Sequence, residues 1–206
     1  ALNLGIWVLI GSLALKTDDV DGRFANRSFL IGPDGEIKGR YDKIHMFDVT
    51  LSDTESYKES AGYRPGTQSI MTPTPLGEIG LSICYDLRFS YLYRALAKAG
   101  AEILTVPAAF AQATGQAHWE ILLRARAIET GCFLFAPAQT GAHQEVSGGK
   151  RKTYGHSLAI SPWGEVLYDG GTECGVGIVE YDLNDVAKAR SAVPSLQHDR
   201  EFEAPK

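Results

Sequence analysis

The sequence predicts one layered α/β domain, and three observations lead to this fold class. Its 206 residues, 44% of them hydrophobic and 22% charged, suit a single globular unit. Residues 79–107 have the order strand, helix, strand, which is typical of sheets covered by helices. The turn pattern of residues 28–36 returns at 157–165 with Ser, Ile, Pro, Gly and Glu at identical spacing. The repeat favours similar hairpins in two facing sheets, although two hairpins with common turn residues would also produce it.

The first part of the chain predicts strands. GIWVLIGSLALK (5–16) is an apolar run that predicts a buried strand and is too short for a membrane helix. Residues 27–43 predict a hairpin around Pro-Asp-Gly, because proline fixes φ and glycine accepts a positive φ. Residues 50–67 are polar and predict a loop, and residues 68–84 predict a strand pair.

Helices and strands alternate in the rest of the chain. Helical periodicity over 90–99 ends at Gly100, and 115–131 predicts a second helix that Gly131 closes. Strands are predicted for EILTVP (102–107), CFLFAPAQTG (132–141) and GVGIVEYDL (175–183).

Charge and cysteine content narrow the functional classes. A formal charge of -5 and a pI near 5.5 give no reason to expect nucleic acid or a membrane as partner, so we expect a small molecule. Cysteines at 84, 132 and 174 are too few for a disulfide framework, and no CxxC pair indicates zinc. We therefore expect no metal, no cofactor and a reducing, cytoplasmic location.

GLSICYDLRF (80–89) places Cys84 where an apolar run gives way to charged residues. Alternation puts Ile79, Leu81 and Ile83 on one strand face and Cys84 at the C-terminal end, where β-α units present ligand-binding groups. Free cysteine is also among the most buried residue types. The position alone leaves both core filling and a nucleophile open.

A thiol nucleophile needs a base, and it needs a positive or N–H environment for the oxyanion that forms. Lys43 ends a predicted strand in an apolar setting, and Glu55 and Glu59 precede a Pro-Gly turn. Each of these residues alone is typical of a solvated charge, but together with Cys84 they favour a catalytic set. A Cys-His pair with His156 is an alternative, although histidines at such spacing are usually structural.

Several separated motifs together resemble the nitrilase superfamily of carbon-nitrogen hydrolases. They are YDKIHMFDV (41–49), Glu59-Ser60 with YRPG (63–66), CYDLRF (84–89), LTVPAAF (104–110) and HWEILLRARAIETGCF (118–133). Their order and gaps are most similar to the Nit-type amidases, which include ω-amidases and deaminated glutathione amidases. The resemblance implies a four-layer α-β-β-α sandwich, a homodimer or higher homo-oligomer, and hydrolysis of a small ω-amide of a carboxylic acid through a thioester.

The resemblance also implies roles for individual residues. Cys84 would be the nucleophile, Lys43 and the backbone N–H of Tyr85 would face the oxyanion, and Glu59 would orient Lys43. A nearby ammonium lowers the pKa of a thiol, so we expect Cys84 to alkylate faster than Cys132 and Cys174, which lie in segments predicted as apolar strands.

Substrate contacts are less specific. Arg88 and Phe110 are candidates, and Arg124 and Arg126 could also bind a carboxylate, although salt bridges within the fold, to Asp86 or Glu129 for example, are the simpler use. The expected pocket loops, 107–116 and 138–153, contain no pattern that identifies a substrate.

The chain departs from the family pattern in two places. Ser90 stands where a proline is usual, which a serine helix cap tolerates. The family's general base is a glutamate upstream of GIWVLIGS, and no residue from 1 to 42 matches it. We therefore expect residues 1–206 to be a single carbon-nitrogen hydrolase domain without its N-terminal strand-helix portion, a fragment of a longer amidase rather than a naturally shortened relative.

Two alternatives to an amidase share this fold. A binding or scaffold protein would bind ligand without turnover, and a thiol acyltransferase would pass the acyl group to an amine and make an amide. Ammonia release from an ω-amide would select the amidase.

Overall fold

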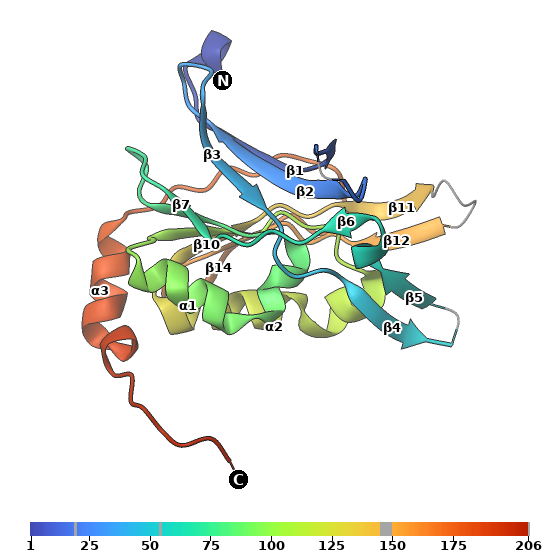
Figure 1. Cartoon of the computed structure of the whole chain (residues 1–206). Helices are drawn as coiled ribbons and strands as arrows, with labels where there is room; N and C mark the ends of the chain where they lie inside the picture. The colour runs from blue at the N-terminus through green and yellow to red at the C-terminus, as the bar shows by residue number, and fades with distance from the viewer. Residues whose placement is uncertain (19, 54, 145–149, 206) are drawn as a thin grey trace.

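Two β-sheets pack face to face, and helices cover the outer side of the larger sheet (Figure 1). The computed structural model describes residues 1–18, 20–53, 55–144 and 150–205. Its layers follow the order sheet, sheet, helices, which are three of the four layers expected for an α-β-β-α sandwich.

The smaller sheet contains four strands. β1 and β3 flank β2 in antiparallel register, and β6 adds a short parallel pairing to the start of β2. The turn between β2 and β3 closes through a hydrogen bond from Gly32 N to Glu36 O of 2.9 Å, and Gly35 adopts φ 82° there. The strands are β1 Val8–Lys16, β2 Phe24–Ile31, β3 Ile37–Asp42 and β6 Tyr63–Arg64.

The larger sheet has six strands in the order β14-β13-β10-β9-β8-β7, and the central β8, β9 and β10 are parallel. Its hairpin β13-β14 and the β2-β3 hairpin lie in different sheets, as the repeated turn pattern predicted. The strands are β7 Ile70–Thr72, β8 Ile79–Leu81, β9 Ile103–Thr105, β10 Phe133–Ala136, β13 Leu158–Ile160 and β14 Val166–Asp169.

Alternation along the parallel strands divides the core in two. Ile103 and Phe133 point toward the smaller sheet and meet Leu30, whereas the next residues, Leu104 and Leu134, point toward the helices. Period-two alternation of this kind is what a sheet buried on both faces requires. The parallel strands therefore lie between two hydrophobic cores, one under the helices and one between the sheets.

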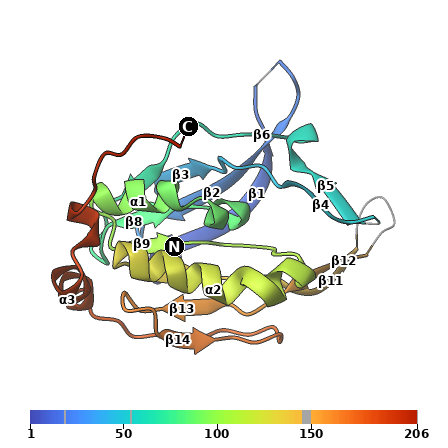
Figure 2. The same ribbon diagram turned by 90° about the horizontal axis from the view of Figure 1, so that it is seen from below.

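Helices α1 and α2 lie on the outer face of the larger sheet (Figure 2). Trp119 and Leu123 of α2 are fully buried, and Gly131 ends the helix in the left-handed region at φ 59° as predicted. A third helix, α3, lies at the end of the larger sheet where its parallel strands begin (Figure 1). The bounds are α1 Ser90–Lys98, α2 Gln112–Thr130 and α3 Asn184–Ala192. Among the described residues, none of the helices has the length and apolarity that crossing a bilayer requires.

Short elements complete the fold. Two separate hairpins, β4-β5 and β11-β12, project from the same side of the molecule (Figure 1). The hairpin strands and 3-10 turns are β4 Asp48–Ser52, β5 Glu55–Lys58, β11 Thr140–Gln144, β12 Lys150–Tyr154, η1 Leu2–Leu4, η2 Glu59–Ala61, η3 Cys84–Arg88 and η4 Ser195–Gln197.

Three sequence predictions of local structure were wrong. The polar segment 50–67 contains the end of β4 and all of β5 and β6, because a ribbon exposed on one face needs few apolar residues. Segment 175–183 is irregular, since its glycines weaken a strand and no strand among the described residues pairs with it. Val176 and Ile178 are 93% and 89% exposed. β1 is only partly buried, because no described helix covers the outer face of its sheet.

Candidate active site

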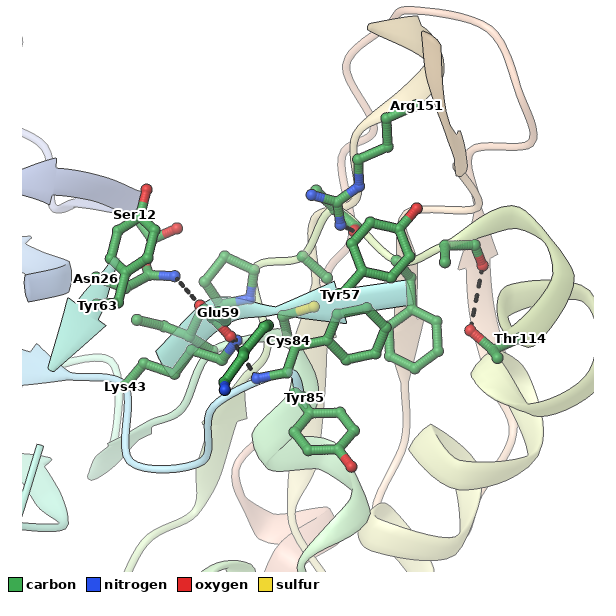
Figure 3. Close-up of a pocket in the computed structure, with 18 residues that line it drawn as sticks. Ser12, Asn26, Lys43, Tyr57, Glu59, Tyr63, Cys84, Tyr85, Thr114 and Arg151 are labelled. Carbon is green, nitrogen blue, oxygen red and sulfur yellow. Dashed lines mark hydrogen bonds and ion pairs between the residues drawn. The ribbon is translucent and has the colours of Figure 1, made fainter. Parts of the chain in front are cut away.

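Cys84 occupies a strained turn just after β8. Its backbone φ is 49°, a region that non-glycine residues adopt rarely and mostly at functional sites. The Cys84 N–H donates to Pro107 O at 3.0 Å, which fixes the turn against the segment after β9. Cys84 is partly buried, and its sulfur faces a cavity (Figure 3).

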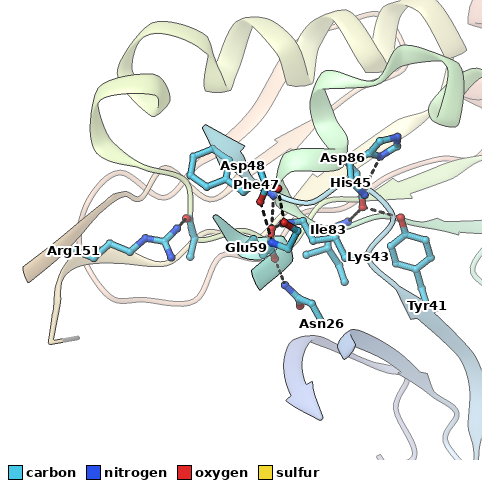
Figure 4. Close-up of polar contacts among 12 residues, drawn as sticks. Asn26, Tyr41, Lys43, His45, Phe47, Asp48, Glu59, Ile83, Asp86 and Arg151 are labelled. Carbon is cyan, nitrogen blue, oxygen red and sulfur yellow. Dashed lines mark hydrogen bonds and ion pairs between the residues drawn. The ribbon is translucent and has the colours of Figure 1, made fainter. Parts of the chain in front are cut away.

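The buried Asp86 side chain stabilises this turn by hydrogen bonds. It is fully buried and accepts hydrogen bonds from Ile83 N at 2.9 Å, Tyr41 hydroxyl at 2.7 Å and His45 N at 3.0 Å (Figure 4). A carboxylate that satisfies donors from two segments fixes them relative to each other. Asp86 therefore ties the Cys84 turn to the chain around Lys43.

Lys43 and Glu59 form a buried ion pair beside the thiol. Lys43 Nζ lies 2.5 Å from Glu59 Oε2, and the two side chains are 3% and 14% exposed. The same Glu59 oxygen accepts from Phe47 N at 2.6 Å, and the other oxygen accepts from Asn26 Nδ2 at 3.1 Å (Figure 4). Glu59 is thus held by three donors, and it holds Lys43 in turn.

A cavity of about 340 Å³ brings most of the predicted site residues together (Figure 3). Its volume is within the range of small-molecule sites. Cys84, Lys43, Glu59, Tyr85 and Phe110 all line it. The N–H of Tyr85 belongs to the first turn of η3, where N–H groups have no acceptor within the helix.

Arg88 lies outside the residues that line this cavity. Its guanidinium carbon is 5.5 Å from the ring centroid of Phe110 and 5.8 Å from that of Tyr85, and Nη2 lies 3.3 Å from His118 Nδ1. Arg88 therefore contacts the outer side of two cavity residues.

The other arginine and histidine candidates are engaged elsewhere. Arg126 pairs with Glu129 at 2.8 Å, the internal salt bridge that the sequence suggested, and Arg124 pairs with Glu120 at 3.3 Å. His156 is also outside the cavity, with Nδ1 3.0 Å from the Asp169 carboxylate.

The electrostatic balance at Cys84 differs from the sequence prediction. Burial raises the pKa of the thiol above its ordinary value, while the Lys43 charge and the backbone N–H of Ala109 lower the pKa by a smaller amount. The sequence predicted the effect of the lysine but not the larger effect of burial. The other two cysteines also differ from each other, since Cys132 is buried whereas Cys174 is exposed in an irregular segment.

Asp86 and Arg151 are site residues that the sequence reasoning did not identify. Arg151 enters the cavity wall from β12, within a segment that showed no readable pattern. Asp86 had one available signal, because an acidic residue in the first turn of a helix often accepts from the N–H that precedes the turn.

No group of three or more His, Cys, Asp and Glu side chains in the described parts of the chain is arranged to hold a metal ion. The charged and nucleophilic groups that line the cavity are a thiol, two ammonium groups, a guanidinium and a carboxylate that is already paired.

A family model described as carbon-nitrogen hydrolase matches residues 1–191. The chain belongs to the carbon-nitrogen hydrolase family. This carbon-nitrogen hydrolase is 42% identical over 201 residues to the deaminated glutathione amidase of Yersinia enterocolitica, an alignment that covers 97% of the chain and 69% of that relative. The family predicted from the motifs is confirmed.

Solved structures confirm the fold of this carbon-nitrogen hydrolase. Nit3 of Saccharomyces cerevisiae, a member of branch 10 of the nitrilase superfamily, is similar with a TM-score of 0.83 at 28% identity, over 98% of this chain and 69% of Nit3. A mutant amidase from Nesterenkonia sp. AN1 is similar with a TM-score of 0.71 at 26% identity, over 93% of this chain and 67% of that protein. That amidase carries the acetamide moiety of fluoroacetamide covalently added at its active-site cysteine.

Proposed function

We propose that this carbon-nitrogen hydrolase is an amidase that cleaves a small ω-amide of a carboxylic acid through a thioester on Cys84. The observation that carries the proposal is the Cys84 thiol on a strained turn, inside a cavity of about 340 Å³ that also contains the Lys43–Glu59 ion pair. The names of the amidase relatives and the cysteine adduct of the Nesterenkonia protein support it.

In the first step, the Cys84 sulfur attacks the amide carbon. The carbonyl oxygen becomes an oxyanion, which Lys43 and the backbone N–H of Tyr85 stabilise. One such donor is typically worth about 10²- to 10³-fold in rate. Because Glu59 fixes the ammonium of Lys43 before the reaction, little reorganisation is needed when the charge develops.

The thiol proton has to pass to a base and then to the departing amine, so that ammonia leaves as the C–N bond breaks. Glu59 is unsuited to this task because three donors already occupy its oxygens. Lys43 is unsuited because a protonated amine has no basic lone pair. The family resemblance assigns the proton transfer to a second glutamate, and no further carboxylate lines the cavity among the described residues.

In the second step, water attacks the thioester and passes its proton to the same base. The C–S bond breaks, the carboxylic acid leaves, and the thiol is restored. The oxyanion of this step forms in the same place as the first, so the same two donors stabilise both.

We also propose that the protein forms homo-oligomers. Large apolar side chains are exposed on α2 and on the neighbouring turn between β13 and β14, where Ile121, Ile128 and Trp163 are 70%, 55% and 59% exposed. An apolar surface of this kind marks an interaction site more often than a free surface.

Ammonia release tests the proposed activity. The purified protein is incubated with ω-monoamides such as α-ketoglutaramate, deaminated glutathione and glutaramate, and free ammonia is measured. Cys84→Ala should lower kcat by on the order of 10⁴-fold or more, as losses of catalytic nucleophiles do. Cys174→Ala is the matched control and should retain activity, because Cys174 is exposed and outside the cavity. An active Cys84→Ala protein would exclude the thioester mechanism.

A further inference from the structure

The cavity wall opposite the Lys43–Glu59 pair contains a further cation, the guanidinium of Arg151 (Figure 3). We propose that Arg151 forms a carboxylate-binding subsite, which holds the far end of a dicarboxylic acid monoamide while its amide lies at Cys84. The proposal rests on the amidase function above and assigns the residue that selects an anionic acyl group.

Arg151 reaches the cavity from β12 with its guanidinium already fixed in place (Figure 3). Nη2 donates to Ala109 O at 2.7 Å, and the guanidinium carbon lies 5.4 Å from the ring centroid of Tyr57. A guanidinium held by a carbonyl and an aromatic ring loses little further entropy when it binds a ligand. Arg151 is therefore preorganised.

Hydrogen-bonding capacity of Arg151 is left unused. Its Nε is buried without a hydrogen-bond partner among the described residues, and no carboxylate in the described parts of the chain pairs with the guanidinium. Buried donors are almost always satisfied in proteins, and exceptions call for a ligand or a functional reason. A carboxylate is the group that best matches the donor fork of an arginine.

The charged residues that line the cavity are Lys43, Lys58, Arg151 and Glu59. The Glu59 carboxylate is paired with Lys43, with 2.5 Å between Oε2 and Nζ. Lys58 and Arg151 therefore give the cavity an excess of positive charge. The whole chain has a formal charge of -5, so this local excess runs against the overall charge. The cavity should therefore attract an anion rather than a neutral amide.

The backbone of Ala109 lies beside both the thiol and the guanidinium. Its carbonyl accepts from Arg151 Nη2 at 2.7 Å, and its N–H lowers the pKa of the Cys84 thiol. The thiol and the guanidinium line the same cavity, on either side of this residue. The acyl chain of a four- or five-carbon diacid, with its bonds to sulfur and guanidinium, spans about 9–10 Å.

The test compares two amides of equal chain length, glutaramate with a terminal carboxylate and pentanamide without one. Arg151→Met should lower kcat/KM for glutaramate by about 10- to 150-fold, mostly through KM, since charged hydrogen bonds contribute about 1.5–3 kcal/mol. The value for pentanamide should fall by a several-fold smaller factor than that for glutaramate, because pentanamide has no carboxylate for the guanidinium to bind. Arg151→Lys should recover part of the glutaramate loss, since an ammonium keeps the charge without the fork. Lys152→Met is the matched control, because Lys152 is exposed on the same strand.

A structural role for Arg151 would give a different result. If the guanidinium only pins Ala109, both amides should lose activity equally, and this outcome would overturn the subsite. Unchanged glutaramate kinetics in Arg151→Met would overturn it as well.

Binding of glutarate to the Cys84→Ala protein separates the subsite from the amidase chemistry. Calorimetric titration should show weaker binding after Arg151→Met by a similar factor, whether or not the wild type hydrolyses amides. If the protein hydrolyses pentanamide and Arg151→Met does not weaken glutarate binding, the amidase is retained and the subsite is excluded. Arg151-dependent glutarate binding without turnover of either amide would retain the subsite although the protein tested shows no amidase activity.

Discussion

The reactivity of Cys84 depends on opposing effects on one thiol. Burial raises its pKa, while the charge of Lys43 and the Ala109 N–H lower it. Since burial is the largest of these effects, the fraction of Cys84 that is thiolate at neutral pH is smaller than for a free thiol. As long as the pH stays below the pKa, this fraction rises about tenfold with each unit increase in pH. Cys84 therefore needs a base to remove its proton during the reaction, because little of the thiol is ionised beforehand.

This balance predicts how alkylation of Cys84 changes with pH. In a Cys174→Ser background, which removes the exposed thiol, the iodoacetamide rate at Cys84 should keep rising beyond the ordinary thiol range of about 8.5. Lys43→Met should move the profile to higher pH, because it removes the largest effect that lowers the pKa. Mass spectrometry of the Cys84 peptide gives the rates.

Loss of Lys43 alone also leaves Glu59 as an unpaired buried charge, which typically costs about 3–5 kcal/mol of stability. The double variant Lys43→Met/Glu59→Gln avoids this, and it should shift the profile in the same direction because the effect of Lys43 exceeds that of Glu59. A rate that levels off well below pH 8, or a shift to lower pH, would contradict this account of the thiol.

At the scale of elements, the contact between α2 and β12 positions the cavity wall. Gly115 of α2 is buried against Tyr154, which lies three residues beyond Arg151 in the sequence. A Cβ on Gly115 would lie 2.3 Å from Tyr154 Cβ, which real structures do not allow. The helix and the strand can approach this closely only because residue 115 has no side chain.

Gly115→Ala should therefore destabilise the protein despite the better helix propensity of alanine. Overpacking typically costs about 1–3 kcal/mol, against a gain of up to about 1 kcal/mol from propensity. The displaced β12 carries Arg151, so KM for glutaramate should rise more than KM for pentanamide. Thermal unfolding and steady-state kinetics measure both effects, with Gln116→Ala on the exposed face as control. A higher melting temperature for Gly115→Ala would show that the two elements are free to separate.

Elements were predictable where local chemistry alone decides them. Gly131 ends α2 because of its own backbone freedom, and the β2-β3 turn follows from proline and glycine within a few residues. Segment 175–183 was predicted wrongly because its apolar residues suit a strand, whereas strand formation also needs a pairing partner elsewhere in the chain. α3 gave only a weak signal, with Val186 and Ala189 as its buried residues.

At the scale of the whole molecule, the fold and part of the site followed from motifs. Cys84, Lys43 and Glu59 were recognisable because each belongs to a motif with a family counterpart, and the structure brings all three to one cavity. Arg151 was not recognisable, since its place in the cavity depends on the packing of β12 against α2 rather than on its neighbours in sequence. Arg88 shows the converse, because its motif suggested a substrate contact but its side chain lies beyond the cavity lining.

The most direct test of the central claim is to trap the acyl-enzyme. Acid quenching during turnover of glutaramate, followed by intact-mass and peptide analysis, should reveal an adduct with the mass of the substrate minus ammonia on the peptide that contains Cys84. The adduct should be absent from Cys84→Ala and from protein quenched without substrate. An adduct on another residue, or turnover by the Cys84→Ala protein, would contradict Cys84 as the nucleophile.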